Sequence, residues 1–79
     1  MTLTKTQDGE YKGLVVLDGH KVECIASNQS YGGFSYTVYV NGTIVDSDGF
    51  TGLRLRDIKI MADTYMVEDS VLAYTNLIQ

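Results

Sequence analysis

The sequence predicts an α+β fold, in which an antiparallel β-sheet of three to five strands is covered on one face by a C-terminal helical segment. Two observations predict the sheet: residues 34–40 alternate apolar and polar side chains, and four Asp-Gly or Asn-Gly dipeptides mark turns. A third observation predicts the helical segment, because apolar side chains after residue 49 recur at helical spacing. Residues 1–79 are too few for a second core, so we expect a single domain.

The clearest hairpin joins residues 34–40 to residues 43–47 through Asn41-Gly42. Asn and Gly tolerate the positive φ angles of a two-residue hairpin turn. Such a turn fixes the register, because it places the residues on its two sides directly opposite each other. The predicted pairs are Val40 with Thr43, Tyr39 with Ile44, and Val38 with Val45. Tyr39 and Ile44 should then lie on the face away from the core, beside Thr37 and Asp46.

A second hairpin is predicted from residues 11–17 and 20–27 around Asp18-Gly19. Its core face should carry Tyr11, Val15, Leu17, Val22, Cys24 and Ala26. Its other face mixes charged with apolar residues, and is predicted to be either partly covered or a contact surface: Lys12, Leu14, Val16, Lys21, Glu23 and Ile25. Residues 2–7 are expected to add an edge strand through Asp8-Gly9.

The helical segment follows Asp48-Gly49, with an apolar stripe of Leu55, Ile58, Met61, Ala62 and Tyr65. Thr51 is a candidate N-cap. Residues 68–70 are polar, and they are predicted to interrupt the stripe. Residues 71–78 are predicted to form a shorter second helix, with a strand as the alternative.

The residues that carry enzyme chemistry are too few for an active site. His20 and Cys24 are the only ones of their kinds, and on one strand they stand roughly 13 Å apart, too far for a thiol–imidazole pair. Residues 46–49 resemble the start of a calcium loop. The rest of the loop does not fit, because Thr51 stands where the loop requires Gly and Asp57 stands where it requires its final Glu. We therefore predict no enzyme activity, no cofactor and no metal, and an enzyme that uses carboxylates alone is the remaining alternative.

Composition argues against binding to nucleic acid and against insertion into a membrane. The net charge of −4 with only six Lys and Arg disfavours a protein that grips nucleic acid through its phosphates. The alternative is that the bases of a single-stranded nucleic acid stack on Tyr31, Tyr36 or Tyr39. No apolar run approaches the length of a membrane span, and none follows Lys5 as in a secretory leader. Together with a single cysteine, this predicts a cytoplasmic protein.

The acidic second half is predicted to attract a basic surface on a partner protein, with solubility alone as the alternative role of this charge. The residues predicted to bind that partner are Tyr39, Ile44, Asp46, Asp48, Asp63, Glu68 and Asp69. The alternative function is a structural or assembly module that self-associates into a homo-oligomer, through either the face of Leu14, Val16 and Ile25 or an open sheet edge.

Residues 36–45 and the helix that follows them resemble many small acidic proteins encoded by bacteriophages. Some of these are inhibitors of bacterial defence, including anti-CRISPR proteins, several of which pair an antiparallel sheet with one or two helices. The resemblance covers about half of the chain and contains no diagnostic motif, so it transfers no site residue. It implies a non-enzymatic inhibitor that works in the host cytoplasm by occupying a basic functional surface of a host defence protein.

Overall fold

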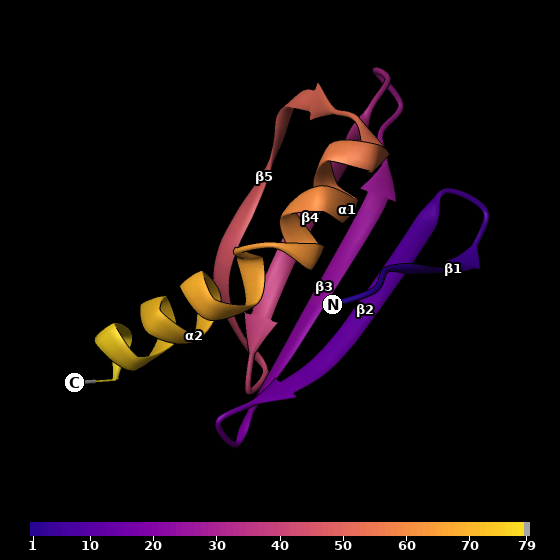
Figure 1. The fold of residues 1–79 in the computed structure, drawn as a ribbon. Helices are drawn as coiled ribbons and strands as arrows, with labels where there is room; N and C mark the ends of the chain where they lie inside the picture. Colours follow the sequence, from indigo (N-terminus) through magenta and orange to yellow (C-terminus); the bar gives the residue numbers. More distant parts are fainter. Residues whose placement is uncertain (79) are drawn as a thin grey trace.

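The computed structural model describes residues 1–78, apart from the side chains of residues 49–51. A five-stranded antiparallel sheet forms one layer, and two helices lie together on one of its faces (Figure 1). This confirms the predicted α+β fold. The elements are β1 (Thr4–Gln7), β2 (Glu10–Leu17), β3 (His20–Asn28), β4 (Phe34–Val40), β5 (Thr43–Leu53), α1 (Leu55–Asp63) and α2 (Met66–Leu77).

The sheet is a meander, in which each strand pairs with the next one in the sequence. Both predicted hairpin turns are present, because Asp18 and Asn41 each adopt a φ of 51° and are followed by a glycine of positive φ. The β2–β3 register is the predicted one, with Leu17 opposite His20 and Val15 opposite Val22. The edge strand β1 is also present as expected, although it is short and exposed.

The register between β4 and β5 departs from the prediction after two pairs. Tyr39 lies opposite Ile44 as expected, but Val38 lies opposite Asp46 instead of Val45. A β-bulge at this point adds one residue to β5. Because side chains alternate between faces, one extra residue reverses the faces of the residues that follow. Asp46 therefore lies on the helix side of the sheet, and the predicted position beside Thr37 on the open face is wrong.

Strand β5 also continues past Asp48-Gly49, where the sequence predicted a change to helix. Its last residue, Leu53, pairs with Phe34 at the start of β4. Helix α1 begins directly afterwards, with Arg54 as an extended N-cap that forms no side-chain hydrogen bond. The predicted cap at Thr51 is therefore wrong, because that position belongs to the strand.

The helical segment breaks earlier than predicted, at Thr64 and Tyr65 instead of at residues 68–70. The Thr64 hydroxyl donates to the carbonyl oxygen of Ile60 at 2.7 Å, which satisfies a backbone acceptor where α1 ends. Glu68 and Asp69 occupy the first turn of α2, where carboxylates interact favourably with the helix dipole. Helix α2 runs from Met66 to Leu77, so a second helix is confirmed and the strand alternative is wrong. This helix is longer than α1, not shorter as predicted, because it begins before the polar residues 68–70.

The core lies between the helices and the two central strands, β3 and β4. Alternate residues of these strands point toward the helices, and Ile58 of α1 fills the space above them. The largest fully buried side chains are Ile58, Val22, Val38, Val40 and Cys24. This arrangement leaves the opposite face of the sheet without a covering layer among the described residues.

The buried Cys24 thiol provides a test of this core. Burial, and secondarily the negative charge of Asp46, raises the pKa of Cys24 to about 11. We expect the native protein to resist iodoacetamide at about pH 8, and to react fully in urea, because the thiolate is the nucleophile. Mass spectrometry of the labelled protein measures both. Labelling of the native protein at the rate of the unfolded one would contradict the burial of this side chain.

Candidate functional site

The negative charge of the chain is concentrated in β5 and α2. These two elements contain Asp46, Asp48, Glu68 and Asp69, and neither contains a Lys or an Arg. The other six acidic residues equal the six Lys and Arg in number, so the net charge of −4 belongs to β5 and α2. The two elements lie beside each other at one edge of the molecule (Figure 1). The acidic half predicted from the sequence thus becomes one acidic edge.

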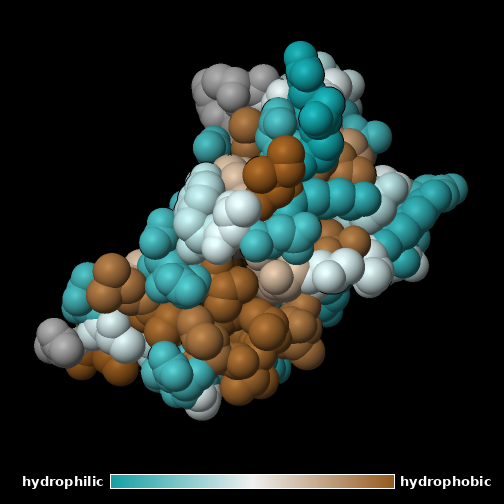
Figure 2. All heavy atoms as spheres, in the orientation of Figure 1, coloured by the Kyte–Doolittle hydropathy of each residue, from teal (hydrophilic) through white to brown (hydrophobic). Residues whose placement is uncertain are grey.

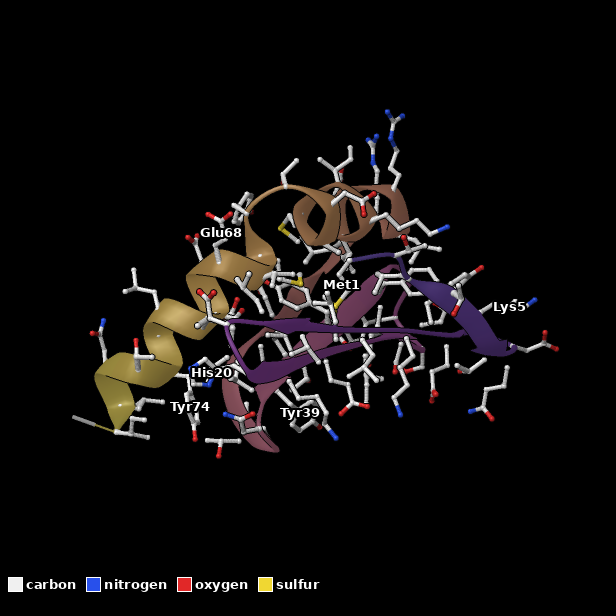
Figure 3. All side chains as sticks on the ribbon, turned by 60° about the horizontal axis from the view of Figure 1, so that its bottom comes forward. Met1, Lys5, His20, Tyr39, Glu68 and Tyr74 are labelled. Atoms are coloured by element: carbon white, nitrogen blue, oxygen red, sulfur yellow. The ribbon has the colours of Figure 1, made fainter. Side chains whose placement is uncertain are left out.

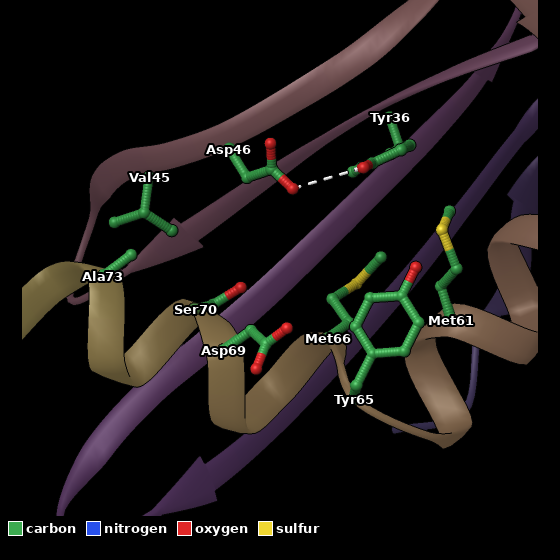
Figure 4. Close-up of a pocket in the computed structure, with 9 residues that line it drawn as sticks. All are labelled: Tyr36, Val45, Asp46, Met61, Tyr65, Met66, Asp69, Ser70 and Ala73. Carbon is green, nitrogen blue, oxygen red and sulfur yellow. Dashed lines mark hydrogen bonds between the residues drawn. The ribbon is translucent and has the colours of Figure 1, made fainter.

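A pocket of about 290 Å³ opens in this acidic edge, between α2 and strands β4 and β5. Its apolar lining includes Met61 and Met66, together with Val45 and Ala73. Its polar lining comes from both layers, and Figure 4 shows these side chains around a common space: Tyr36, Asp46, Tyr65, Asp69 and Ser70. We call this space the acidic pocket.

Asp46 reaches the acidic pocket because of the bulge in β5. The Tyr36 hydroxyl donates to Asp46 Oδ2 at 3.2 Å. Tyr36 is only 7% exposed, and this burial, with the charges of Asp46 and Asp48, raises the pKa of its hydroxyl well above the usual range. The hydroxyl therefore stays protonated at neutral pH and keeps donating to Asp46. This hydrogen bond holds the Asp46 carboxylate at the pocket.

Ser70 is the buried polar residue of the pocket, at 4% exposure. Its hydroxyl forms no hydrogen bond within the described part of the chain, and its oxygen faces the pocket, through which solvent reaches it (Figure 4). The free hydroxyl of Ser70 is therefore a ready partner for a polar group that enters the pocket.

Of the residues predicted to bind a partner, the structure brings Asp46 and Asp69 together at the pocket. Asp48 lies two residues from Asp46 on the same strand and opposite Tyr36. Asp63 does not join them, because its Oδ1 lies 3.7 Å from the backbone nitrogen of Met1. The acidic cluster is thus smaller than the sequence predicted.

Glu68 lies away from the acidic pocket, beside a second groove of about 330 Å³ between α2 and the end of β2. Leu17, Val71 and Leu72 line this groove. Figure 2 shows that hydrophobic side chains gather in this lower part of the helix side. Glu68 is the acidic residue at the edge of that apolar surface, so it and Asp69 face different grooves although they are neighbours in sequence.

Tyr39 lies on the open face of the sheet, opposite the helices (Figure 3), and Ile44 is paired with it there. They continue a row of paired residues that starts with Leu14 and Glu23, and Glu23 also forms an ion pair of 3.0 Å with Lys12. Tyr39 and Ile44 therefore belong to a different surface from the acidic pocket. The structure therefore does not bring them together with Asp46 and Asp69.

The three tyrosines considered for nucleic-acid stacking do not share a surface. Tyr36 is buried in the core, Tyr39 lies on the open face, and Tyr31 is exposed in the loop before β4. A stacking platform needs its rings on one accessible face. The prediction that Tyr36 serves as an accessible stacking residue is wrong.

Of the residues that line the acidic pocket, the sequence predicts only Asp46 and Asp69 as site residues. It places Met61 and Tyr65 only in the core stripe, and Ser70 only in its interruption. A signal was available, since Met66, Ser70 and Ala73 recur at the i, i+4, i+7 spacing of one helix face. The spacing goes unrecognised because the break predicted at residues 68–70 divides this helix face between two elements.

Within residues 1–78, no three or more His, Cys, Asp or Glu side chains are grouped so as to hold a metal ion. His20 instead contacts Asn41, with 3.0 Å between His20 Nδ1 and the amide nitrogen, and its ring lies 5.5 Å from that of Tyr74. Neither of the two described helices has the length and apolar character needed to cross a membrane. Comparisons with protein-family models, with curated proteins and with solved structures find no match to this chain.

Proposed function

We propose that this chain is a non-enzymatic protein-binding domain, which acts by covering a basic surface of its partner. The observation that carries the proposal is the acidic edge, where β5 and α2 hold the whole net charge of the chain. Asp46, Glu68 and Asp69 form no ion pair within the described part of the chain. Like charges so arranged repel one another, and a basic partner relieves that repulsion.

A surface of this kind favours fast, salt-sensitive association. Exposed charges steer a partner of opposite sign during its approach, and salt screens them over about 8–10 Å. Where the basic surface is one that a host defence protein uses, covering it would inhibit that protein, as the resemblance to phage-encoded inhibitors implies. The host cytoplasm is the compartment in which such a partner would be met.

The test compares two variants that lose the same amount of charge. The first replaces the four carboxylates of β5 and α2 by their amides, Asp46→Asn, Asp48→Asn, Glu68→Gln and Asp69→Asn. The control makes the same change elsewhere, with Asp8→Asn, Glu10→Gln, Asp18→Asn and Asp57→Asn. A partner is isolated with the tagged wild-type chain from a bacterial lysate, identified by mass spectrometry, purified and titrated by calorimetry at low and high salt.

We expect the first variant to bind the partner at least about tenfold more weakly than the wild type, and the control to bind it nearly as well. Wild-type affinity should fall as the salt concentration rises. Equal losses of affinity for the partner in the two variants, or a wild-type affinity that does not depend on salt, would show that the acidic edge does not form the interface.

A second candidate function is self-association through the open face of the sheet. The observation in its favour is that Leu14, Val16 and Ile44 are 58%, 65% and 57% exposed there. Exposed apolar side chains on one face are typical of a surface that another protein covers. Sedimentation equilibrium over a wide concentration range tests this candidate, and a monomer mass at every concentration would argue against it.

A further inference from the structure

Building on the proposed binding of a basic partner, we infer that the acidic pocket receives the side chain of one arginine from that partner. The guanidinium would lie between the carboxylates of Asp46 and Asp69 and would donate to the hydroxyl oxygen of Ser70. The aliphatic part of the arginine would pass the methionines that line the same pocket. Each part of this assignment follows from a different observation.

The polar groups of the pocket favour a cation that donates several hydrogen bonds. Asp46 and Asp69 approach from the two layers of the protein, and both are exposed enough to form the mouth of the pocket. Ser70 and Tyr36 are buried beneath them, and the Tyr36 hydroxyl already donates to Asp46. A guanidinium carries five N–H donors and no acceptor, so it matches this set of acceptors.

The free hydroxyl of Ser70 is an observation independent of the charges. It is 4% exposed and unpartnered within the described part of the chain, and it faces the pocket (Figure 4). The carboxylates alone would be compatible with an ordinary solvated acidic surface. The Ser70 hydroxyl adds an acceptor at the base of the pocket that no other group of the described chain uses.

The rest of the lining distinguishes arginine from lysine. Met61, Met66 and the ring of Tyr65 make much of the wall apolar and polarisable. A guanidinium is planar and weakly hydrated, and it stacks on aromatic rings, whereas an ammonium is a strongly hydrated point charge. Methionine side chains adapt to the shape of what lies against them. The free-energy cost of losing hydration on entering this pocket is therefore smaller for an arginine than for a lysine.

The size of the pocket fits one side chain. Its volume of about 290 Å³ lies just below the range of about 300–1,000 Å³ that is usual for small-molecule sites. A single side chain inserted from a protein surface needs less room than a whole cofactor or substrate. One arginine side chain presented by a protein partner therefore fits this volume.

The first experiment uses the full chain, labelled with ¹³C at its methionine methyl groups, and three short peptides. The peptides differ only at one central residue, which is arginine, lysine or the neutral arginine analogue citrulline, among glycines and serines. Saturable shifts of the Met61 and Met66 methyl signals with the arginine peptide are expected, at least about fivefold weaker binding with lysine, and none with citrulline. Equal binding of arginine and citrulline, or shifts confined to other residues, would overturn the inference.

Three variants then locate the contact. Asp69→Asn should weaken binding of the arginine peptide about tenfold, because it removes a charge-assisted hydrogen bond, and Ser70→Ala by a smaller factor. Asp18→Asn is the matched control, since it removes the same charge at the β2–β3 turn, outside both the acidic edge and the pocket lining. The affinity of this variant for the arginine peptide should equal that of the wild type. A loss of affinity with Asp18→Asn as large as with Asp69→Asn would exclude the pocket.

Asp69→Asn and Glu68→Gln, compared on the isolated basic partner, separate this inference from the proposed function. If Asp69→Asn and Glu68→Gln weaken binding of the isolated basic partner equally, and the peptides show no preference for arginine, the acidic edge binds through general charge and the arginine pocket is wrong. If neither variant changes partner binding, and the four-carboxylate variant does not either, the proposed function fails as well. Unfolding midpoints measured for each variant show whether a loss reflects the fold.

Discussion

The Ile58→Ala variant is expected to lose about 2–5 kcal/mol of unfolding free energy, a large share of the total for a chain of this size. Ile58 is fully buried where α1 meets the sheet. Truncation removes buried apolar area and leaves a cavity that α1 cannot easily close. The helix is joined to β5 by Arg54 alone and to α2 by two residues, so it has little freedom to move inward. Urea unfolding followed by circular dichroism measures the change.

Ile60→Ala is the control for this prediction, because it removes the same atoms from the same helix. Ile60 is 51% exposed, so its truncation leaves no cavity and should cost at most about 0.5 kcal/mol. A comparable loss in the two variants would mean that α1 does not dock through the face of Ile58.

The second large effect is expected from Gly33→Ala, which should cost about 3 kcal/mol or more. A Cβ at this position would lie 2.6 Å from the Cα of Gly52. Since the obstacle is backbone, no side chain can rotate away to relieve the contact. Gly33 also has a φ of 76°, which an L-residue with a side chain adopts only at a cost of about 1–2 kcal/mol. The substitution therefore pushes apart the start of β4 and the end of β5.

Gly32→Ala separates the two contributions to this loss. Gly32 has a φ of 99°, but a Cβ there would meet nothing within 4 Å. This variant should show the conformational cost alone, and Gly33→Ala should lower the melting temperature further. Each additional 1 kcal/mol corresponds to about 4–8 °C in a domain of this size. Equal melting temperatures for the two variants would rule out the close approach of Gly33 and Gly52.

The features that the sequence predicted correctly are those that depend on neighbouring residues. Asn41-Gly42 and Asp18-Gly19 specify their turns locally, because their own φ preferences match a two-residue hairpin. The alternation of residues 34–40 then defines which side chains enter the core. The C-terminal helices were likewise visible from the spacing of their apolar residues.

The features that the sequence could not predict depend on contacts between distant elements. Val45 is apolar and Asp46 is polar, so simple alternation places Val45 inward. The structure instead inserts a bulge, and Asp46 accepts a hydrogen bond from Tyr36 at the edge of the core. The same applies to the acidic pocket. Asp46 and Asp69 come together only because α2 packs beside β5, and no local pattern encodes that arrangement.

The meander has a consequence for the order in which the protein acquires its structure. Each strand can pair with its neighbour through a short turn, and closing a short loop costs little conformational entropy. The absence of proline removes prolyl isomerisation as a slow step. Docking of the helices is then the long-range step, and we expect it to complete the acidic pocket last. A basic partner that binds this pocket would therefore stabilise the final step of folding by mass action.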